Sequence, residues 1–370
     1  MLGLPILSAQ AGFQPSLFIF AICWLFMIST GLLLVEVHSW FGKETSLVTM
    51  AKTTLGFPGQ LMSWLVYLFL FYSFMVAYLA ASGSLIADFF GEFSSVSFPH
   101  WVGNLFFCFL FALLLFFGTG VVDWCNRLLM LALMIAYLLL VVNGASHVNS
   151  SFLAHKHWNA VTAAIPAAIV SFGFHNLIPS LSNYFHGRVK PLVLSIVIGS
   201  AIPLLVYIVW QWIILGIVPP QEFAQAINKG EIATEALREA VGASWIVDIA
   251  QFFALFAIIT SLLGVSLSFV DFLADGLRIQ KNVRGRIILI LLVLVPPLLF
   301  AGIYPSIFLT ALNAAGGFGA VILFGILPVL MVWKGRYVQN RNASPLLFGG
   351  RPLLLLLFFF SVWVILLQFI

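Results

Sequence analysis

Long apolar stretches separated by short polar segments make up most of this chain of 370 residues. A membrane-spanning helix needs roughly 17–25 predominantly apolar residues to cross the hydrocarbon layer. Stretches of this kind predict ten spans, near residues 15–38, 60–86, 102–118, 128–143, 160–184, 191–216, 244–271, 286–303, 305–332 and 352–370. The pattern indicates an all-α polytopic membrane protein, with a further apolar fragment at residues 1–8.

The composition agrees with this class, because the chain is 62% hydrophobic and 8% charged. Soluble domains are roughly 45–50% apolar and about 25% charged. The net charge of +4 is explained by an asymmetry between loops and does not indicate nucleic acid. The expected partners are the lipid bilayer and a small-molecule substrate. No cofactor, metal ligand set or obligate protein partner is indicated.

Basic residues occur in alternate loops, which predicts the orientation of the chain. Thirteen of the 16 lysines and arginines fall on one side: Lys43, Lys52, Arg127, Arg188, Lys190, Arg278, Lys281, Arg284, Arg286, Lys334, Arg336, Arg341 and Arg351. This side is the cytoplasmic one by the positive-inside rule, so the C-terminus is expected in the periplasm. The longest polar segment, residues 217–243, lies on the outer side and reads as one or two short amphipathic helices.

The same orientation makes residues 1–8 the outer half of a helix that begins in the cytoplasm. A helix that starts within hydrocarbon leaves its first N–H groups unsatisfied. We therefore expect the natural chain to extend upstream by half a span and a short tail, on the order of 20 or more residues.

The stretch SFGFHNLIPSLSNY, residues 171–184, carries helix-breaking and polar residues inside a predicted span. Pro179 has no N–H, so the carbonyl of His175 is expected to lose its helical donor, and Gly173 weakens the helix further. Irregular backbone at this depth is tolerated where it lines a cavity or is buried in protein. Free carbonyls suit an ammonium and free N–H groups suit a carboxylate, so the break predicts an amino acid site. The alternative is a kinked helix in which His175 and Asn176 form interhelical hydrogen bonds.

An internal repeat is visible when MLGLPILSA is aligned with HNLIPSLSN, because Pro5 then matches Pro179. Pro5 would free the carbonyl of Met1 in the same way. The two segments run in opposite directions, as an inverted repeat requires. The chain is then a single transporter domain, with a first repeat in residues 1–143 that lacks half of helix 1, a second in 160–332, and an appended helix in 352–370.

Five segments resemble the bacterial hydroxy/aromatic amino acid permease family, most closely its tyrosine-specific transport branch. They are FGFHNLIPSL within 171–184, GLLLVEV at 31–37, WLVYLFLFYSFMVAY at 64–78, SLIADFFG at 84–91 and FLTALNAAGGFGA at 308–320. The resemblance implies the 11-helix inverted-repeat (5+5+1) fold of the amino acid, polyamine and organocation superfamily. It also implies proton-coupled uptake of an aromatic amino acid across the bacterial inner membrane.

The predicted substrate-binding residues are Met1, Tyr72, Phe172, Gly173, Phe174, His175 and Asn176, where the aromatic rings can stack on the substrate. The candidates for ion coupling are His175, Thr260, Ser261 and Asp271. For Asp271 we favour an interfacial ion pair with the basic loop that begins at Arg278, and for Thr260 and Ser261 we favour helix packing over a sodium site. The small residues of 314–320 are expected to allow close helix approach.

The leading hypothesis is a secondary transporter for tyrosine that couples uptake to protons by alternating access. A tryptophan or serine/threonine permease of the same family and sodium coupling are the alternatives within transport. An intramembrane enzyme would concentrate acids, histidines or arginines at one membrane face. A channel would show a repeated filter or rings of like charge. Neither pattern is present, so we do not expect an enzyme.

Overall fold

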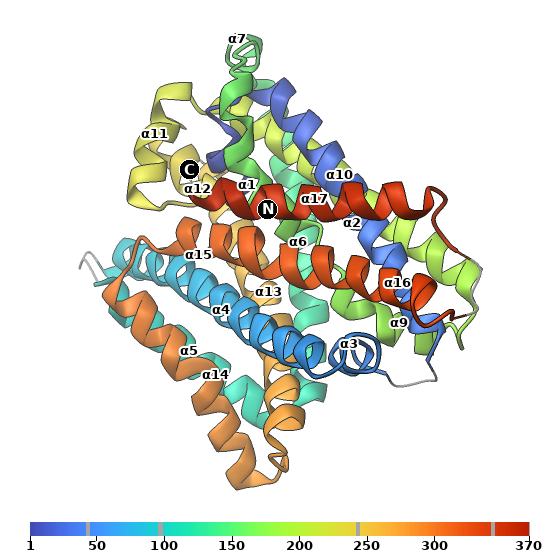
Figure 1. Ribbon diagram of the computed structural model, residues 1–370. Coiled ribbons are helices and arrows are strands. Elements are labelled where there is room, and N and C mark those ends of the chain that lie inside the picture. Colours follow the sequence, from blue (N-terminus) through green and yellow to red (C-terminus); the bar gives the residue numbers. More distant parts are fainter. Residues whose placement is uncertain (42–44, 95–98, 242–244, 342–344, 370) are drawn as a thin grey trace. The chain divides into compact units, whose positions relative to one another are not determined.

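The computed structural model describes residues 1–41, 45–94, 99–241, 245–341 and 345–369, without the side chains of residues 84, 86–94 and 100. Lys43, one of the residues used for the orientation, lies outside these ranges. Within them every regular element is a helix (Figure 1). The chain divides into two compact units, each assembled from separate segments of the sequence.

The first unit contains residues Met1–Phe13, Phe71–His155 and Trp210–Leu312. Its helices are α1 (Leu4–Ser8), the second part of α4 (Phe57–Ser94), α5 (His100–Phe117), α6 (Thr119–Gly144), η1 (Ala145–His147), α7 (Ser150–Leu153), the end of α10 (Val189–Ile217), α11 (Pro220–Lys229), α12 (Ala233–Val241), α13 (Trp245–Leu277), α14 (Val283–Ile303) and the start of α15 (Phe308–Ala314).

Helix α13 packs along α6, and α14 packs along α5 and α13. Trp210 is fully buried with its ring centroid 4.9 Å from that of Phe253, and Tyr137 of α6 lies 5.9 Å from the same ring. Helices α4 and α5 approach closely, because a Cβ atom at Gly103 would lie 2.5 Å from the carbonyl oxygen of Gly83. Lipid is as apolar as these side chains, so close packing holds the helices together.

The second unit contains residues Gln14–Leu70, Lys156–Val209 and Asn313–Ile370. Its helices are α2 (Phe13–Ser39), α3 (Leu47–Leu55), the first part of α4, η2 (Trp158–Ala164), α8 (Ile165–Ser171), η3 (His175–Leu177), α9 (Ile178–Tyr184), most of α10, the end of α15, the π-helix η4 (Ala315–Ile326), α16 (Leu327–Tyr337), α17 (Gly350–Leu366) and η5 (Leu367–Phe369).

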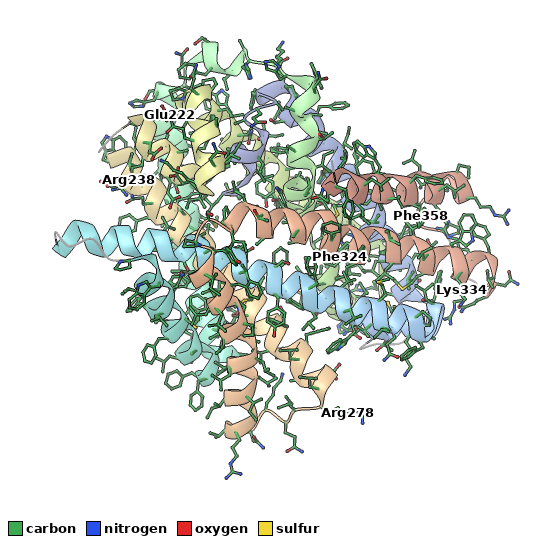
Figure 2. All side chains as sticks on the ribbon, turned by 60° about the vertical axis from the view of Figure 1, so that its left-hand side comes forward. Glu222, Arg238, Arg278, Phe324, Lys334 and Phe358 are labelled. Carbon is green, nitrogen blue, oxygen red and sulfur yellow. The ribbon has the colours of Figure 1, made fainter. Side chains whose placement is uncertain are left out.

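The π-helix η4 is the centre of packing in this unit, since both α8 and α17 lie against it. A Cβ atom at Gly316 would lie 1.9 Å from the carbonyl oxygen of Pro166 in α8. At Gly325 it would lie 2.7 Å from Oγ of Ser361 in α17. The close helix approach predicted for residues 314–320 is therefore confirmed. Figure 2 labels Phe324 and Lys334, which lie on η4 and α16 of the same continuous helix.

The predicted span 128–143 begins too late, because α6 starts at Thr119, directly after Gly118. Gly118 ends α5 with φ of +92°, a backbone conformation that favours glycine. The sequence predicts Arg127 in a loop, but it lies within the helix and forms an ion pair with Asp123, at 2.8 Å. The two charges are four residues apart on an exposed helix face, where they stabilise the helix.

Nine helical segments among the described residues are long and apolar enough to cross a membrane, and Trp101–Phe117 is a shorter apolar helix. These segments correspond in order to the ten predicted spans. An all-helical polytopic membrane protein is therefore the class that both sequence and structure support.

The polar segment between α10 and α13 forms a pair of short helices, α11 and α12, as predicted. Gly230 separates them with φ of +70° and lies against Ser306, where a Cβ atom would be 2.2 Å from the carbonyl oxygen. Hydrogen bonds to Glu239 and Glu231 raise the pKa of Lys229. The N–H of Ala233 donates to the carbonyl of Leu2, which joins this helix pair to α1.

Candidate functional site

The span Trp158–Tyr184 is broken where the sequence predicts a break. Helix α8 ends at Ser171, a 3₁₀ turn begins at His175, and α9 begins at Ile178 with Pro179 as its second residue. The N–H of Phe172 donates to the carbonyls of Ala168 and Ile169 and closes the end of α8. Residues 172–174 therefore lie outside any helix, between α8 and the turn that leads into α9.

The free backbone groups are not the ones that the sequence predicted. The carbonyl of His175 accepts the N–H of Ile178, because the chain closes a 3₁₀ turn there. Within the described part of the chain, it is the carbonyls of Phe172 and Gly173 that accept no hydrogen bond, and the N–H groups of residues 174–176 that donate none. The prediction that Pro5 frees the carbonyl of Met1 is also wrong, since that carbonyl accepts the N–H of Leu4 at 3.2 Å.

His175 is fully buried between two helices and two aromatic rings. Its Nε2 lies 2.9 Å from Oγ1 of Thr30 on α2. The ring stacks on Phe174, with centroids 4.9 Å apart, and on Phe324 of η4, with centroids 4.7 Å apart. The hydroxyl of Thr30 also lies 3.1 Å from the carbonyl of Phe26, so it can donate there and accept from Nε2–H. We assign the proton to Nε2, which leaves Nδ1 as a buried acceptor with no partner among the described residues.

The neighbours of His175 differ in their exposure. Gly173 and Asn176 are exposed, whereas Phe172 is 4% exposed and lies 5.4 Å from Tyr207 between ring centroids. The hydroxyl of Tyr207 donates to the carbonyl of Ser171 at 3.0 Å, which holds the end of α8. Gly173 and Asn176 are therefore the most accessible of residues 172–176.

The remaining predicted residues belong to the first unit and have partners there. The hydroxyl of Tyr72 donates to the carbonyl of Leu292 at 2.9 Å, and its ring meets Phe269 edge-on. Thr260 donates to the carbonyl of Phe256 in its own helix at 2.8 Å, and Ser261 follows it on α13.

Asp271 forms an ion pair with Lys281, with the charged atoms 2.7 Å apart and both side chains about half exposed. The interfacial ion pair with the basic loop, which the sequence predicts for Asp271, is therefore confirmed.

The sequence profile of the tryptophan/tyrosine permease family matches residues 1–368. The chain belongs to this family.

Relatives within this permease family match nearly the whole chain. The tyrosine-specific transport system 1 of Haemophilus influenzae is 33% identical over 98% of this chain and 91% of the relative. The tyrosine-specific transport system 2 of the same organism is 30% identical over 100% of this chain and 92% of the relative. The tryptophan-specific transport protein of that organism is 30% identical over 95% of this chain and 87% of the relative. Membership makes this chain a multi-pass bacterial membrane protein of an aromatic amino acid permease family, and it supports transport over catalysis.

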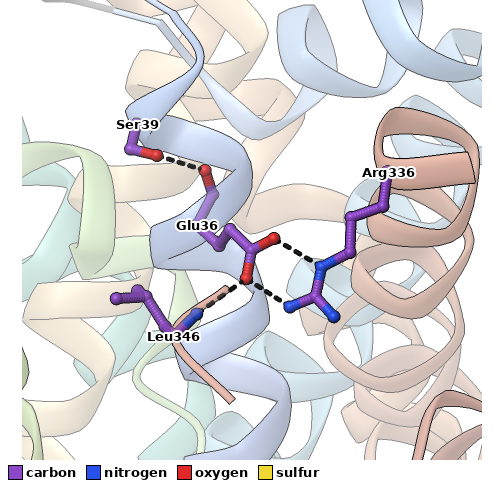
Figure 3. Close-up of polar contacts among 4 residues, drawn as sticks. All are labelled: Glu36, Ser39, Arg336 and Leu346. Atoms are coloured by element: carbon purple, nitrogen blue, oxygen red, sulfur yellow. Dashed lines mark hydrogen bonds and ion pairs between the residues drawn. The ribbon is translucent and has the colours of Figure 1, made fainter. Parts of the chain in front are cut away.

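A second polar cluster in this permease lies where α2 meets α16, and Figure 3 shows its geometry. The carboxylate of Glu36 is fully buried and accepts two hydrogen bonds from Arg336. Nε donates to Oε1 at 2.6 Å, and Nη2 donates to Oε2. The N–H of Leu346 reaches the second oxygen at 3.2 Å. Such a bidentate pair is among the stronger hydrogen-bonded arrangements in proteins. It joins α2, α16 and the segment before α17.

Sequence reasoning missed the residues that hold the break in place. These residues are Thr30, Gly31 and Phe324. Thr30 directly precedes the segment GLLLVEV, Gly31 is the first residue of that segment, and Phe324 follows the small residues of 314–320. A Cβ atom at Gly31 would lie 2.7 Å from the ring of Phe174, so glycine is required for this approach. The small-residue pattern indicated close packing, but no local signal identifies which ring fills the space.

Proposed function

We propose that this protein imports an aromatic amino acid, tyrosine foremost, across the bacterial inner membrane by proton symport with alternating access. The observation that carries the proposal is the helix break at residues 172–177, with its free backbone groups inside a membrane span. The proposal is further supported by the family and by the transport proteins that resemble the chain over its full length.

The break offers complementary groups for an amino acid. The carbonyl oxygens of Phe172 and Gly173 suit the substrate ammonium, and the N–H groups of Phe174, His175 and Asn176 suit its carboxylate. The exposed side chain of Asn176 adds a donor and an acceptor. The rings of Phe172 and Phe174 are proposed to stack on the aromatic side chain.

His175 is proposed to position this site as well as to contact substrate. Its described partners are a hydroxyl and two phenyl rings, none of which carries a charge. The ring therefore fixes residues 174–176 against α2 and η4. Its Nδ1 is an acceptor through which it can contact substrate or carry the coupled proton.

Other residues predicted from the sequence stay proposals. Tyr72 and Met1 are proposed for substrate binding, and Thr260, Ser261 and Asp271 for ion coupling. The ion pair of Asp271 with Lys281 makes it a weaker candidate than His175. The hydroxyls of Thr260 and Ser261 suit a sodium ion, which keeps sodium coupling as the alternative.

The order of helices supports the proposed inverted repeat. In each half a short helix with proline as its second residue stands directly before a long helix, α1 in residues 1–143 and α9 in 160–332. A long helix follows each, α2 with 27 residues and α10 with 29. After short polar helices come α4 with 38 residues and α13 with 33, then α5 and α14. We propose α17 as the appended eleventh helix and a periplasmic C-terminus.

The test is uptake of radiolabelled tyrosine by cells that produce the protein. Unlabelled tyrosine should compete fully, tryptophan and phenylalanine partly, and serine and threonine least. Full competition by tryptophan, serine or threonine at lower concentration than tyrosine would assign that substrate instead. Replacing sodium with choline should leave uptake unchanged, whereas loss of uptake would favour the sodium alternative.

The variant Asn176→Ala tests the site itself. Loss of one hydrogen bond to a charged substrate group should lower kcat/KM by roughly tenfold or more, with normal membrane abundance. Asn143→Ala is the matched control, because Asn143 is partly exposed and its side-chain amide donates to the carbonyl of Leu139 in its own helix. Equal uptake by the two variants would show that Asn176 does not bind substrate and would favour a structural role for the helix break.

A further inference from the structure

A pocket of about 470 Å³ lies between the end of α16 and the start of α17. Its walls are Arg336, Tyr337, Arg341, Pro345, Leu347, Phe348, Gly349 and Gly350. All of these residues belong to the second unit. The pocket is separate from the helix break, and neither the family nor the proposed transport assigns it a role.

The segment around this pocket is strongly basic. Residues 331–353 contain Lys334, Arg336, Arg341 and Arg351 and no aspartate or glutamate. Glu36 compensates Arg336 through the bidentate pair. Within the described residues, Arg341 and Arg351 form no ion pair, so their charges are available to a ligand.

Both available guanidinium groups are held in place by aromatic rings. The guanidinium of Arg341 lies 4.8 Å from the ring centre of Phe41, and its Nε donates to Oε1 of Gln339 at 2.8 Å. The guanidinium of Arg351 lies 4.7 Å from the ring centre of Tyr337, a wall of the pocket. A guanidinium that stacks on a ring keeps its remaining N–H groups for a planar or tetrahedral anion.

The apolar groups beside the pocket indicate where the ligand comes from. Phe348 is 94% exposed, and the ring of Trp333 meets that of Tyr337 edge-on at the end of α16. Aromatic residues are enriched in this way at membrane interfaces. Helix α17 continues from the pocket with the exposed apolar side chains of Leu355, Leu356 and Phe359. An acyl chain can lie along such an apolar face, whereas a soluble anion such as phosphate makes no favourable contact with it.

We propose that this pocket binds the phosphate of an anionic phospholipid headgroup in the cytoplasmic leaflet. Arg341 and Arg351 contact the phosphate, and Phe348 and the exposed face of α17 contact the acyl chains. Basic pockets beside cytoplasmic helix ends suit such headgroups. The lipid would join the segment before α17 to α16, next to the Glu36–Arg336 pair.

The experiment measures lipid bound to the purified full chain in mild detergent by native mass spectrometry, with phosphatidylglycerol or phosphatidylethanolamine added. We expect one retained phosphatidylglycerol on the wild-type protein and weaker retention of phosphatidylethanolamine. Each arginine near an anionic surface contributes about 1 kcal/mol, so Arg341→Gln with Arg351→Gln should weaken retention about 25-fold. Arg336 is left intact, because its removal would leave Glu36 buried and unpaired.

Two further variants separate this pocket from general surface charge and from misfolding. Arg188→Gln with Lys190→Gln removes the same charge elsewhere in the second unit and should retain the lipid fully. The double variant Arg341→Lys with Arg351→Lys keeps the positive charge but lacks the paired N–H donors of the guanidinium, so it should retain the lipid partly. Equal retention by all variants would overturn the proposal, and so would equal loss in both glutamine variants.

A comparison with inorganic phosphate distinguishes a soluble anion from a lipid as the ligand of this pocket. We expect phosphatidylglycerol, and not phosphate at the same concentration, to raise the melting temperature of the wild-type protein. A rise with phosphate alone that the Arg341 and Arg351 variants abolish would assign the pocket to a soluble phosphate and overturn the lipid assignment.

Discussion

His175 illustrates how a polar residue within a membrane span can hold a helix break in place. Its ring contacts Thr30 of α2 and Phe324 of η4. The three residues before it, 172–174, belong to no helix. A neutral, buried imidazole needs a partner for each ring nitrogen, and here one nitrogen has none among the described residues. The contacts of the ring thus hold residues 174–176 against α2 and η4, and they leave Nδ1 as the acceptor that we propose for substrate or proton.

Thr30→Val tests this hydrogen bond with little change in side-chain volume. The variant leaves Nε2 of His175 buried without a partner, which should destabilise the protein by about 1–3 kcal/mol. It should also lower tyrosine uptake, because the break loses its contact with α2. Thermal unfolding in detergent and initial uptake rates measure the two effects.

Thr53→Val is the control for this substitution, since Thr53 is exposed and its hydroxyl bonds only to the carbonyl of Thr49 in its own helix. Its stability should match that of the wild type. A Thr30 variant that unfolds and transports like the control would show that the hydrogen bond does not support the break.

At the scale of the helices, Glu36 and Arg336 connect elements that are 300 residues apart in sequence. The pair lies six residues after Thr30 on α2 and twelve after Phe324 on the helix that contains η4 and α16. The same two helices are therefore fixed at two levels, once through His175 and once through this ion pair.

Glu36→Leu removes one partner and leaves Arg336 charged without compensation. The expected destabilisation is about 3–5 kcal/mol, because an unpaired buried charge is costly. Adding Arg336→Met should restore most of the lost stability, since apolar residues of similar volume can replace a buried pair. Unfolding temperatures of the three proteins check this. A double variant no more stable than Glu36→Leu would contradict the pairing.

Gly316→Ala tests the contact between α8 and η4. A Cβ atom there would lie 1.9 Å from the carbonyl of Pro166, so the two helices must move apart and lose stability and uptake. Gly302→Ala in α14 is the matched control, because no atom lies within 4 Å of the added Cβ atom. Equal stability of the two variants would contradict the close packing.

The sequence predicts helices better than contacts, for physical reasons. Apolar length and the helix-breaking chemistry of Gly173 and Pro179 are local, so the spans and the position of the break follow from them. The choice of free carbonyl depends on whether the chain closes a 3₁₀ turn after His175, which proline alone does not determine. The partner of Glu36 depends on the packing of distant helices, and the sequence contains four basic residues nearby along α16 and its flanks.

For the whole molecule, the orientation is a prediction that follows from the basic loops. Fusions of alkaline phosphatase after residue 370 should be enzymatically active, because that enzyme folds in the periplasm. Fusions in the loop between Leu277 and Val283 should be inactive, since Arg278 and Lys281 place this loop in the cytoplasm. The opposite pattern would reverse the orientation and remove the lipid pocket from the cytoplasmic leaflet.

The central claim is that the break at residues 172–177 binds an aromatic amino acid whose transport is driven by protons. The most direct measurement is accumulation of radiolabelled tyrosine in sodium-free proteoliposomes under an imposed inward proton gradient. We predict accumulation above equilibrium that an uncoupler abolishes. Its initial rate should fall roughly tenfold in Asn176→Ala and stay unchanged in Asn143→Ala. No gradient-driven accumulation by the reconstituted wild type, or a wild-type initial rate in Asn176→Ala, would contradict the claim.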